Sequence, residues 1–203
     1  MLPVKSKYKI AKRLGAQIFE QTQTQKFALS DARFKKIKRG GRGGSDYGRQ
    51  LLEKQRVRYT YGITERQLSN YAKEAYEAKD PGTTLHQALE MRLDSVAYRA
   101  GIAPTRRAAR QLASHGHLLV NGKRTTTPSF RLRKGDSITV REASKKSPLF
   151  AQLTGEGQEA SRNLPQWLTY DPGILRIDIT GEPLYTPIET ILDYPTLFEF
   201  YSR

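Results

Sequence analysis

One short stretch, residues 105–124, constrains the fold most strongly because it joins a helix signal directly to a hairpin signal. Thr105 is placed to cap the helix, since its hydroxyl can accept a hydrogen bond from a free amide of the first turn. Gly116 suits the left-handed conformation in which helices commonly end. Asn121 and Gly122 follow between apolar runs, and both tolerate positive φ, so they predict a tight β-turn. The stretch therefore predicts a helix beside a small sheet.

The predicted helix carries a cluster of arginines. Arg106 and Arg110 are four residues apart with Arg107 beside them, so three guanidinium groups are expected to project together. Leu112 and the neighbouring alanines supply a small apolar face. A solvated surface charge is the simpler explanation for any single arginine, but the clustering favours contact with the backbone of a folded RNA.

Further elements are predicted on either side. A basic helix from residue 47 to 61 precedes a second helix, residues 64–79, which opens with a capping box at Thr64 and Gln67. A third helix begins with a similar pattern at Thr84, is closed by Gly101, and has one apolar stripe: Leu85, Leu89, Leu93, Val96 and Ala100. Strands are expected at residues 137–140, 167–170 and 174–179.

Charge is distributed unevenly along the 203 residues. The chain has 35 Lys and Arg residues against 20 Asp and Glu, a net charge of +15. Residues 1–60 carry 16 basic and 4 acidic side chains, whereas residues 146–203 carry 4 and 8. Such an excess of positive charge favours a polyanion as partner. The acidic tail is expected to pack on protein and not on RNA.

Several classes of protein are disfavoured by composition. No apolar run approaches the roughly 20 residues needed to span a bilayer, so no membrane partner is expected. The chain has no cysteine, which excludes disulfides and thiolate metal sites. The N-terminus lacks the apolar core of a signal peptide and is interpreted as an exposed basic arm in preference to an organellar transit peptide. The cytosol is the default location.

Residues 1–46 are interpreted as that basic, glycine-rich arm. Its apolar residues are scattered, and are expected to be too few to offset the entropy of ordering, so the arm should be mobile in isolation. Arg39 and Arg42, in a run of glycines, could become ordered against phosphates. A solvated tail with no binding role is the alternative.

The chain also resembles a known family. Residues 53–67, 89–94, 114–117 and 120–123, with the ending 198–203, are similar to bacterial and organellar ribosomal protein S-four, and the resemblance runs from about residue 47 to 203. Residues 105–124 and the preceding helix resemble the S-four-type RNA-binding domain.

The resemblance implies an α+β fold in which a helix pair packs on a small, mostly antiparallel sheet. The expected domains are the arm, residues 1–46; a helical N-terminal domain, residues 47–90, completed by the C-terminal segment 186–203; and the S-four-type domain with a β-rich extension, residues 91–185.

The resemblance implies a function without catalysis or cofactor. The expected role is that of a structural constituent of the small ribosomal subunit, which binds the five-way junction in the 5′ domain of 16S rRNA and nucleates assembly of the subunit body. Ribosomal protein S-five and other small-subunit proteins are expected partners, with a contribution to translational accuracy, and so is mRNA where it enters the subunit. The expected location is a cytoplasmic ribosome, with a plastid ribosome as the alternative.

The residues expected to contact rRNA are mostly basic and come from the arm, the helical domain and the predicted hairpin. They are Arg39, Arg42, Arg49, Arg56, Arg58, Arg66, Arg106, Arg107, Arg110, His115, His117, Asn121, Lys123 and Arg124.

Two motifs resemble a catalytic site or a metal site, but each has a simpler explanation. Residues 92–94 (Arg-Leu-Asp) match a triplet that carries the catalytic aspartate of pseudouridine synthases, but here it precedes the hairpin and lies in an amphipathic helix. The preferred explanation is that Asp94 pairs with an arginine or caps a neighbouring turn. His115 and His117 lack a third plausible metal ligand, so polar contacts to RNA are preferred. Some members of the family bind zinc through N-terminal cysteines, which this chain lacks.

Two rival functions remain: an RNA-modifying enzyme with the same RNA-binding domain, and a stress protein that recycles stalled large subunits. The first should have a separate catalytic domain, for which the residues after Lys145 are too few. The second is a shorter protein that would not account for the helices between residues 47 and 82.

Overall fold

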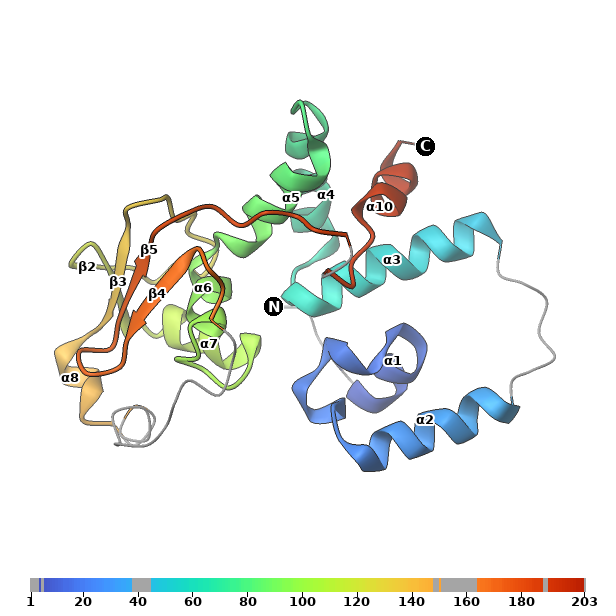
Figure 1. Ribbon diagram of the computed structural model, residues 1–203, viewed down its shortest axis with the longest axis horizontal. Coiled ribbons are helices and arrows are strands. Elements are labelled where there is room, and N and C mark those ends of the chain that lie inside the picture. Colours follow the sequence, from blue (N-terminus) through green and yellow to red (C-terminus); the bar gives the residue numbers. More distant parts are fainter. Residues whose placement is uncertain are drawn as a thin grey trace. The chain divides into compact units, whose positions relative to one another are not determined.

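The computed structural model describes residue 4 and residues 6–37, 45–147, 150, 164–187 and 190–202. The chain divides into two compact units, drawn in Figure 1: a helical unit, residues 1–85 and 186–203, and a sheet unit, residues 86–185. The division falls inside helix α5 (Pro81–Glu90). Together the units confirm the expected α+β class.

The helical unit is built mainly from α-helices. Its elements are α1 (Lys7–Leu14), the 3-10 turns η1 (Ala16–Ile18) and η2 (Glu20–Thr22), α2 (Gln25–Ile37), α3 (Asp46–Tyr61), α4 (Glu65–Tyr76), the start of α5, and α10 (Tyr194–Tyr201). The capping box predicted at Thr64 and Gln67 is present, because each side chain bonds the backbone of the other residue.

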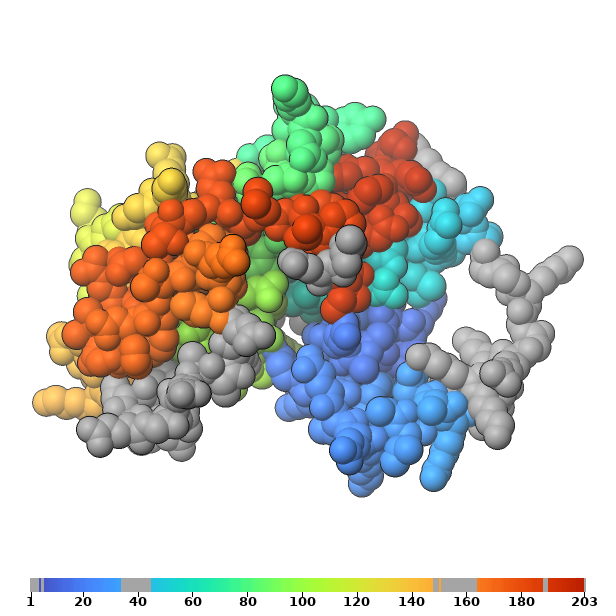
Figure 2. Space-filling view, in the orientation of Figure 1, coloured from blue at the N-terminus to red at the C-terminus, as the bar shows by residue number. Residues whose placement is uncertain are grey.

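The C-terminal helix α10 lies against α3 and α4, far from it in sequence (Figure 2). Tyr201 Oη donates to Glu65 Oε1 of α4 at 2.9 Å. Lys54 Nζ of α3 lies 3.1 Å from the same Glu65 oxygen and 4.1 Å from the ring centroid of Phe200. An acidic, aromatic C-terminal segment thus packs on a basic helix of its own chain.

The interpretation of residues 1–46 as an arm without a core is wrong for their described part. Phe19 and Phe27 are buried with Ala11 in a small cluster. The ring of Phe19 meets that of Tyr59 of α3 edge to face, with centroids 6.3 Å apart. These apolar residues lie eight positions apart on different elements, so no helical or strand period marks them as a core. Arg39 and Arg42 lie outside the described residues.

The sheet unit holds one antiparallel sheet with the strand order β2-β1-β3-β5-β4. The first three strands are β1 (Leu118–Val120), β2 (Lys123–Arg124) and β3 (Ser137–Val140), followed by β4 (Leu168–Asp171) and β5 (Arg176–Ile179). The helices of this unit are the end of α5, then α6 (Leu93–Arg99), α7 (Arg106–Ser114) and the short α8 (Glu142–Lys145).

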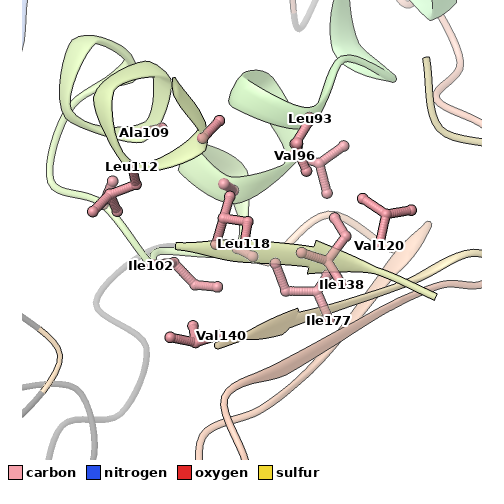
Figure 3. Close-up of a cluster of buried hydrophobic side chains, with 14 of the residues drawn as sticks. Leu93, Val96, Ile102, Ala109, Leu112, Leu118, Val120, Ile138, Val140 and Ile177 are labelled. Atoms are coloured by element: carbon pink, nitrogen blue, oxygen red, sulfur yellow. The ribbon is translucent and has the colours of Figure 1, made fainter. Parts of the chain in front are cut away.

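The core of this unit lies between α6, α7 and one face of the sheet (Figure 3). Alternate residues of the central strands point toward these helices, as the period of two in a strand requires. Among them, Leu118, Ile138 and Ile177 are fully buried. Their neighbours Leu119, Thr139 and Arg176 pair across the strands on the opposite face. One apolar face therefore sets the register of the whole sheet.

The predicted hairpin turn is confirmed. Asn121 and Gly122 have φ angles of 49° and 77°, so both occupy the left-handed region that the Asn-Gly pair favours. Gly116, just after α7, also has a positive φ of 73°. The guanidinium of Arg124 covers this glycine closely, and a Cβ added there would collide with it. The positive φ therefore favours glycine at position 116, whereas the guanidinium is the far end of a flexible, exposed side chain that can move aside.

The single helix expected from residue 84 to 100 is instead two helices, α5 and α6. The backbone leaves the helix at Met91 and Arg92 because residues 128–132 supply other partners: Leu132 N donates to Met91 O at 2.8 Å, and Leu93 N donates to Phe130 O at 3.0 Å. The apolar stripe survives the break, since Leu89, Leu93 and Val96 are all fully buried. The expected start at Thr84 is also wrong, because the helix begins at Pro81 and Asp80 Oδ1 accepts from Thr83 N.

The core can be tested with a matched pair of isoleucines in the sheet unit. Ile138 is 0% exposed and Ile174 is 50% exposed. We expect Ile138→Ala to lower the free energy of unfolding by about 2–5 kcal/mol, through lost burial and a cavity. Ile174→Ala should change it by no more than about 0.5 kcal/mol. Fluorescence of Trp167, the single tryptophan of the chain, reports denaturant unfolding of this unit, since it packs against the core. Equal effects of the two substitutions would contradict the described core.

Candidate nucleic-acid interface

Helix α7 begins as the sequence predicted. The Thr105 hydroxyl accepts a hydrogen bond from Ala108 N at 3.1 Å, which caps the first turn. Ala109, Leu112 and Ala113 are buried against the core of the sheet unit. Arg107 lies on the opposite, polar face of the helix and is exposed.

The other two arginines of the predicted cluster point elsewhere. Arg106 Nη2 lies 3.1 Å from Glu90 Oε1, and its guanidinium carbon lies 4.7 Å from the ring centroid of Tyr98. Arg110 Nη1 lies 3.6 Å from Asp94 Oδ2. Their side chains are only 14% and 19% exposed. The expectation that three guanidinium groups project together is therefore wrong: carboxylates placed by α5 and α6 draw two of them inward.

Glu90 is the centre of the first ion cluster. Its side chain is 1% exposed, and it accepts two hydrogen bonds of 2.8 Å from Arg99 as well as one from Arg106. Burial alone would raise the pKa of this carboxyl above its ordinary value of 4.5, but Arg106 and Arg99 hold it well below that value. Glu90 is therefore ionised at neutral pH, and its ion pairs join α5, α6 and α7.

Asp94 is held in a second ion cluster, as the sequence interpretation preferred. Arg92 Nε and Nη2 donate to its two oxygens at 2.9 Å and 2.7 Å, a bidentate pair in which Arg92 is fully buried. Arg110 approaches the same carboxylate from α7. A carboxylate with these partners is suited to fastening helices and poorly placed to attack a substrate.

The hairpin presents two exposed cations. Lys123 of β2 is exposed, and its amino group has no ion-pair partner among the described residues. Arg124 is exposed too, and its Nη2 donates to His115 O at 3.3 Å. Asn121 supports the turn, since its side chain donates to Asp136 Oδ1 at 2.8 Å and accepts from Ser137 N at 2.9 Å. The structure thus gives Asn121 an internal role.

A second group of exposed cations was missed by the sequence reasoning. Arg131, Arg133 and Lys134 are exposed in the loop before β3, while Leu132 between them is buried. Arg141, directly after β3, is exposed as well. The signal was the alternation of basic residues with one apolar residue, which anchors the loop and turns its charges outward. We name these four residues, with Arg107, Lys123 and Arg124, the basic surface of the sheet unit.

The two predicted histidines lie together at the corner between α7 and β1. His115 is exposed, and His117 is half-buried with its Nδ1 2.9 Å from Ser144 Oγ. No group of three or more potential metal ligands occurs in the part of the chain that the structure describes.

The predicted residues of the helical unit are not equivalent. Arg49 and Arg66 are exposed, and Arg49 lies 3.6 Å from Asp46. Arg56 pairs with Glu53 and donates from Nε to Leu14 O at 2.9 Å. Arg58 Nη1 lies 3.1 Å from Glu65 Oε2. Arg56 and Arg58 thus hold helices of this unit together, whereas Arg49 and Arg66 face solvent.

The Glu90 cluster leads to a prediction about stability. Glu90→Gln keeps the size of the side chain but leaves Arg99 and Arg106 without their counter-charge, so we expect a loss of about 3 kcal/mol in the free energy of unfolding at pH 7. Because the folded-state pKa of Glu90 is lowered, its contribution is present above pH 4.5 and is lost as pH falls below that value.

The measurement is denaturant unfolding at several pH values between 7 and 3. The gap between the original protein and Glu90→Gln should narrow below pH 4.5. Glu142→Gln is the control, since Glu142 is exposed and pairs only with Lys145 of the same helical turn. A gap that does not change with pH would contradict the assignment of Glu90 as a buried anion.

No helix in the described ranges is both long and apolar enough to cross a membrane.

Two family models match successive parts of the chain: the ribosomal protein S4/S9 N-terminal domain over residues 4–91 and the S4 domain over residues 91–138.

Curated relatives match over nearly the full length. Small ribosomal subunit protein uS4 of Roseiflexus sp. (strain RS-1) is 39% identical over 200 residues, which cover 96% of each chain. The protein of the same name from Borrelia turicatae (strain 91E135) is 37% identical over 206 residues, covering 98% of this chain and 96% of the relative. With two family models in sequence and relatives at this identity over both units, the chain belongs to the family of small ribosomal subunit protein uS4.

Proposed function

We propose that this chain is a structural constituent of the small ribosomal subunit that binds 16S rRNA directly. The observation that carries the proposal is the basic surface of the sheet unit, in which exposed cations stand on a sheet and on helix α7, both anchored by a packed core. Membership of the uS4 family supports it independently.

The proposed ligand is the five-way junction in the 5′ domain of 16S rRNA, which the family resemblance implies. Phosphate contacts made by many cations on one preformed surface would hold the helices of a junction in one orientation, and this would nucleate assembly of the subunit body. Specificity should come from the shape of the RNA, because the major groove of A-form RNA is too narrow for side chains to read.

Further parts of the proposal rest on the family alone. They are a contact with ribosomal protein S-five and other small-subunit proteins, a contribution to translational accuracy, proximity to mRNA where it enters the subunit, and a location on ribosomes in the cytoplasm, with a plastid ribosome as the alternative.

A binding role without catalysis fits the site better than the rival RNA-modifying enzyme. Asp94, the one residue that matches a catalytic motif of such enzymes, is buried and held by Arg92 and Arg110. Turnover on uridine-containing RNA would overturn the proposal. The rival role in recycling large subunits predicts that the protein sediments with the large subunit, whereas we expect it with the small subunit.

The interface is tested by the salt dependence of binding to a 16S 5′-domain transcript. We expect Arg107→Gln/Lys123→Gln to weaken binding and to reduce the slope of log K against log salt by about 1.5, which is about 0.7–0.9 for each lost phosphate contact.

Lys145→Gln/Arg176→Gln is the matched control, since it removes the same net charge from the same unit. Both residues already pair with acids, Lys145 with Glu142 and Arg176 with Asp178. The control should leave the slope nearly unchanged. If both double variants reduced the salt slope equally, binding would depend on net charge alone and not on the proposed interface. Equal binding to any structured RNA would contradict the proposed ligand.

Replacing Arg106, Arg107 and Arg110 together would be a poor test, because two of the three hold buried carboxylates. We expect Arg106→Ala to lower the free energy of unfolding by about 3 kcal/mol, since Glu90 then loses one of its two cations. Arg107→Ala should change it by less than about 0.5 kcal/mol. Thermal or denaturant unfolding of the two single variants provides the comparison, and similar stabilities would show that the ion cluster contributes little.

A further inference from the structure

The corner between α7 and β1 holds two imidazole rings side by side. The rings of His115 and His117 are nearly parallel, with an interplanar angle of 16° and centroids 6.0 Å apart. His117 is held from two sides, by its Nδ1 contact with Ser144 Oγ and by the edge of Phe150 at a centroid distance of 6.0 Å. His115 is exposed. One ring is therefore fixed, and the other faces solvent beside it.

Two arginines complete this cluster from other elements. Arg124 of β2 lies against Gly116, between the two histidines in sequence, and bonds His115 O. Arg141 follows β3, and its backbone N donates to His117 O at 2.8 Å, which places the residue next to that histidine. Both arginines are exposed.

The charges that act on His117 are all of one sign. Its pKa is lowered from the ordinary value of 6.5, first by burial and then by the positive groups His115, Arg141 and Arg124. These groups face it from α7, from β2 and from the end of β3. In the adjacent α8, the acid Glu142 is exposed and pairs with Lys145 at 2.6 Å. Burial and these positive neighbours thus favour the neutral form of His117, and an anion bound beside it would favour the charged form.

Helix capping explains only part of the cluster. Cations are stabilised near the carbonyl end of a helix, and Arg124 satisfies a carbonyl at the end of α7. Arg141 is not on this helix, and its guanidinium has no hydrogen-bond or ion-pair partner among the described residues. The exposed guanidinium of Arg141 adds a positive charge near His117 and disfavours the charged form of that imidazole.

We propose that His115, His117, Arg124 and Arg141 form a binding site for an RNA phosphate, and that occupying this site takes up a proton. The inference deepens the proposed function and rests on it, since the phosphate belongs to the RNA already proposed. A phosphate bound by the arginines offsets their repulsion of a charged His117, and the imidazole N–H groups donate hydrogen bonds to it.

Ser144 permits this protonation without a rearrangement. A hydroxyl can donate to a neutral imidazole nitrogen and can accept from a protonated one. The 2.9 Å contact between Ser144 Oγ and His117 Nδ1 therefore persists in both states. His117 can gain a proton at the moment of binding while its ring stays in place.

The test compares affinity for the 16S 5′-domain transcript at pH 8 and pH 6 at constant ionic strength. Because the proposed site charges His117 when the phosphate binds, the original protein should bind about fivefold more tightly at pH 6 than at pH 8, relative to His115→Gln/His117→Asn. Asparagine at position 117 can keep the contact with Ser144. Protonation of the RNA itself is common to both proteins and cancels in the comparison.

Arg133→Gln is the control, because it removes an exposed cation of the same unit away from the histidines. It should weaken binding at both pH values and keep the response to pH. If Arg133→Gln also lost the response to pH, that response would depend on the total charge of the surface and not on the histidines. This result would overturn the proposed site.

Titration calorimetry at pH 7 in buffers of different ionisation heat counts the protons directly. We expect about half to one proton more for the original protein than for the double histidine variant. Junction-specific binding with a proton count near zero in the original protein overturns the inference and leaves the proposed function standing, whether or not the variant folds. Absence of junction-specific binding at any pH overturns both.

Discussion

The sheet unit depends on two buried carboxylates that are shared among arginines. Glu90 at the end of α5 accepts from Arg99 and Arg106, and Asp94 of α6 binds Arg92 bidentately with Arg110 nearby. A buried charge that loses its partner is strongly destabilising, so these contacts permit only a narrow range of positions for α6 and α7. Since only three residues separate the end of α7 from the start of β1, the same ion clusters also position the hairpin.

This arrangement divides the arginines of the unit into two groups with different tasks. The buried group holds the helices, and the exposed group, with Arg107, Lys123 and Arg133 as examples, is presented to solvent by elements that already have a fixed place. Cations on a preformed surface lose little freedom when they meet phosphates, so more of their attraction is available for binding. The internal ion clusters thus support the proposed RNA contacts without taking part in them.

In the helical unit, the C-terminal helix α10 joins the helices, because it packs on α3 and α4. Helix α10 brings Tyr201 to Glu65 and Phe200 to Lys54, so the C-terminal segment packs on helices of its own chain. In this unit Arg56 and Arg58 are used internally, whereas Arg49 and Arg66 remain exposed. In both units an arginine that pairs with an acid from another helix becomes structural, and sequence spacing alone does not tell which arginine that is.

Local physics made several features of this protein predictable from sequence. The cap at Thr105, the capping box at Thr64 and the turn at Asn121 and Gly122 depend on bonds and backbone angles within a few residues, so the sequence by itself determined them. Tertiary structure alone decided three others: the break between α5 and α6, which follows from hydrogen bonds to residues 128–132; the core around Phe19 and Phe27; and the inward direction of Arg106 and Arg110. Each depends on partners distant in the chain, and only the folded backbone brings such partners within bonding distance.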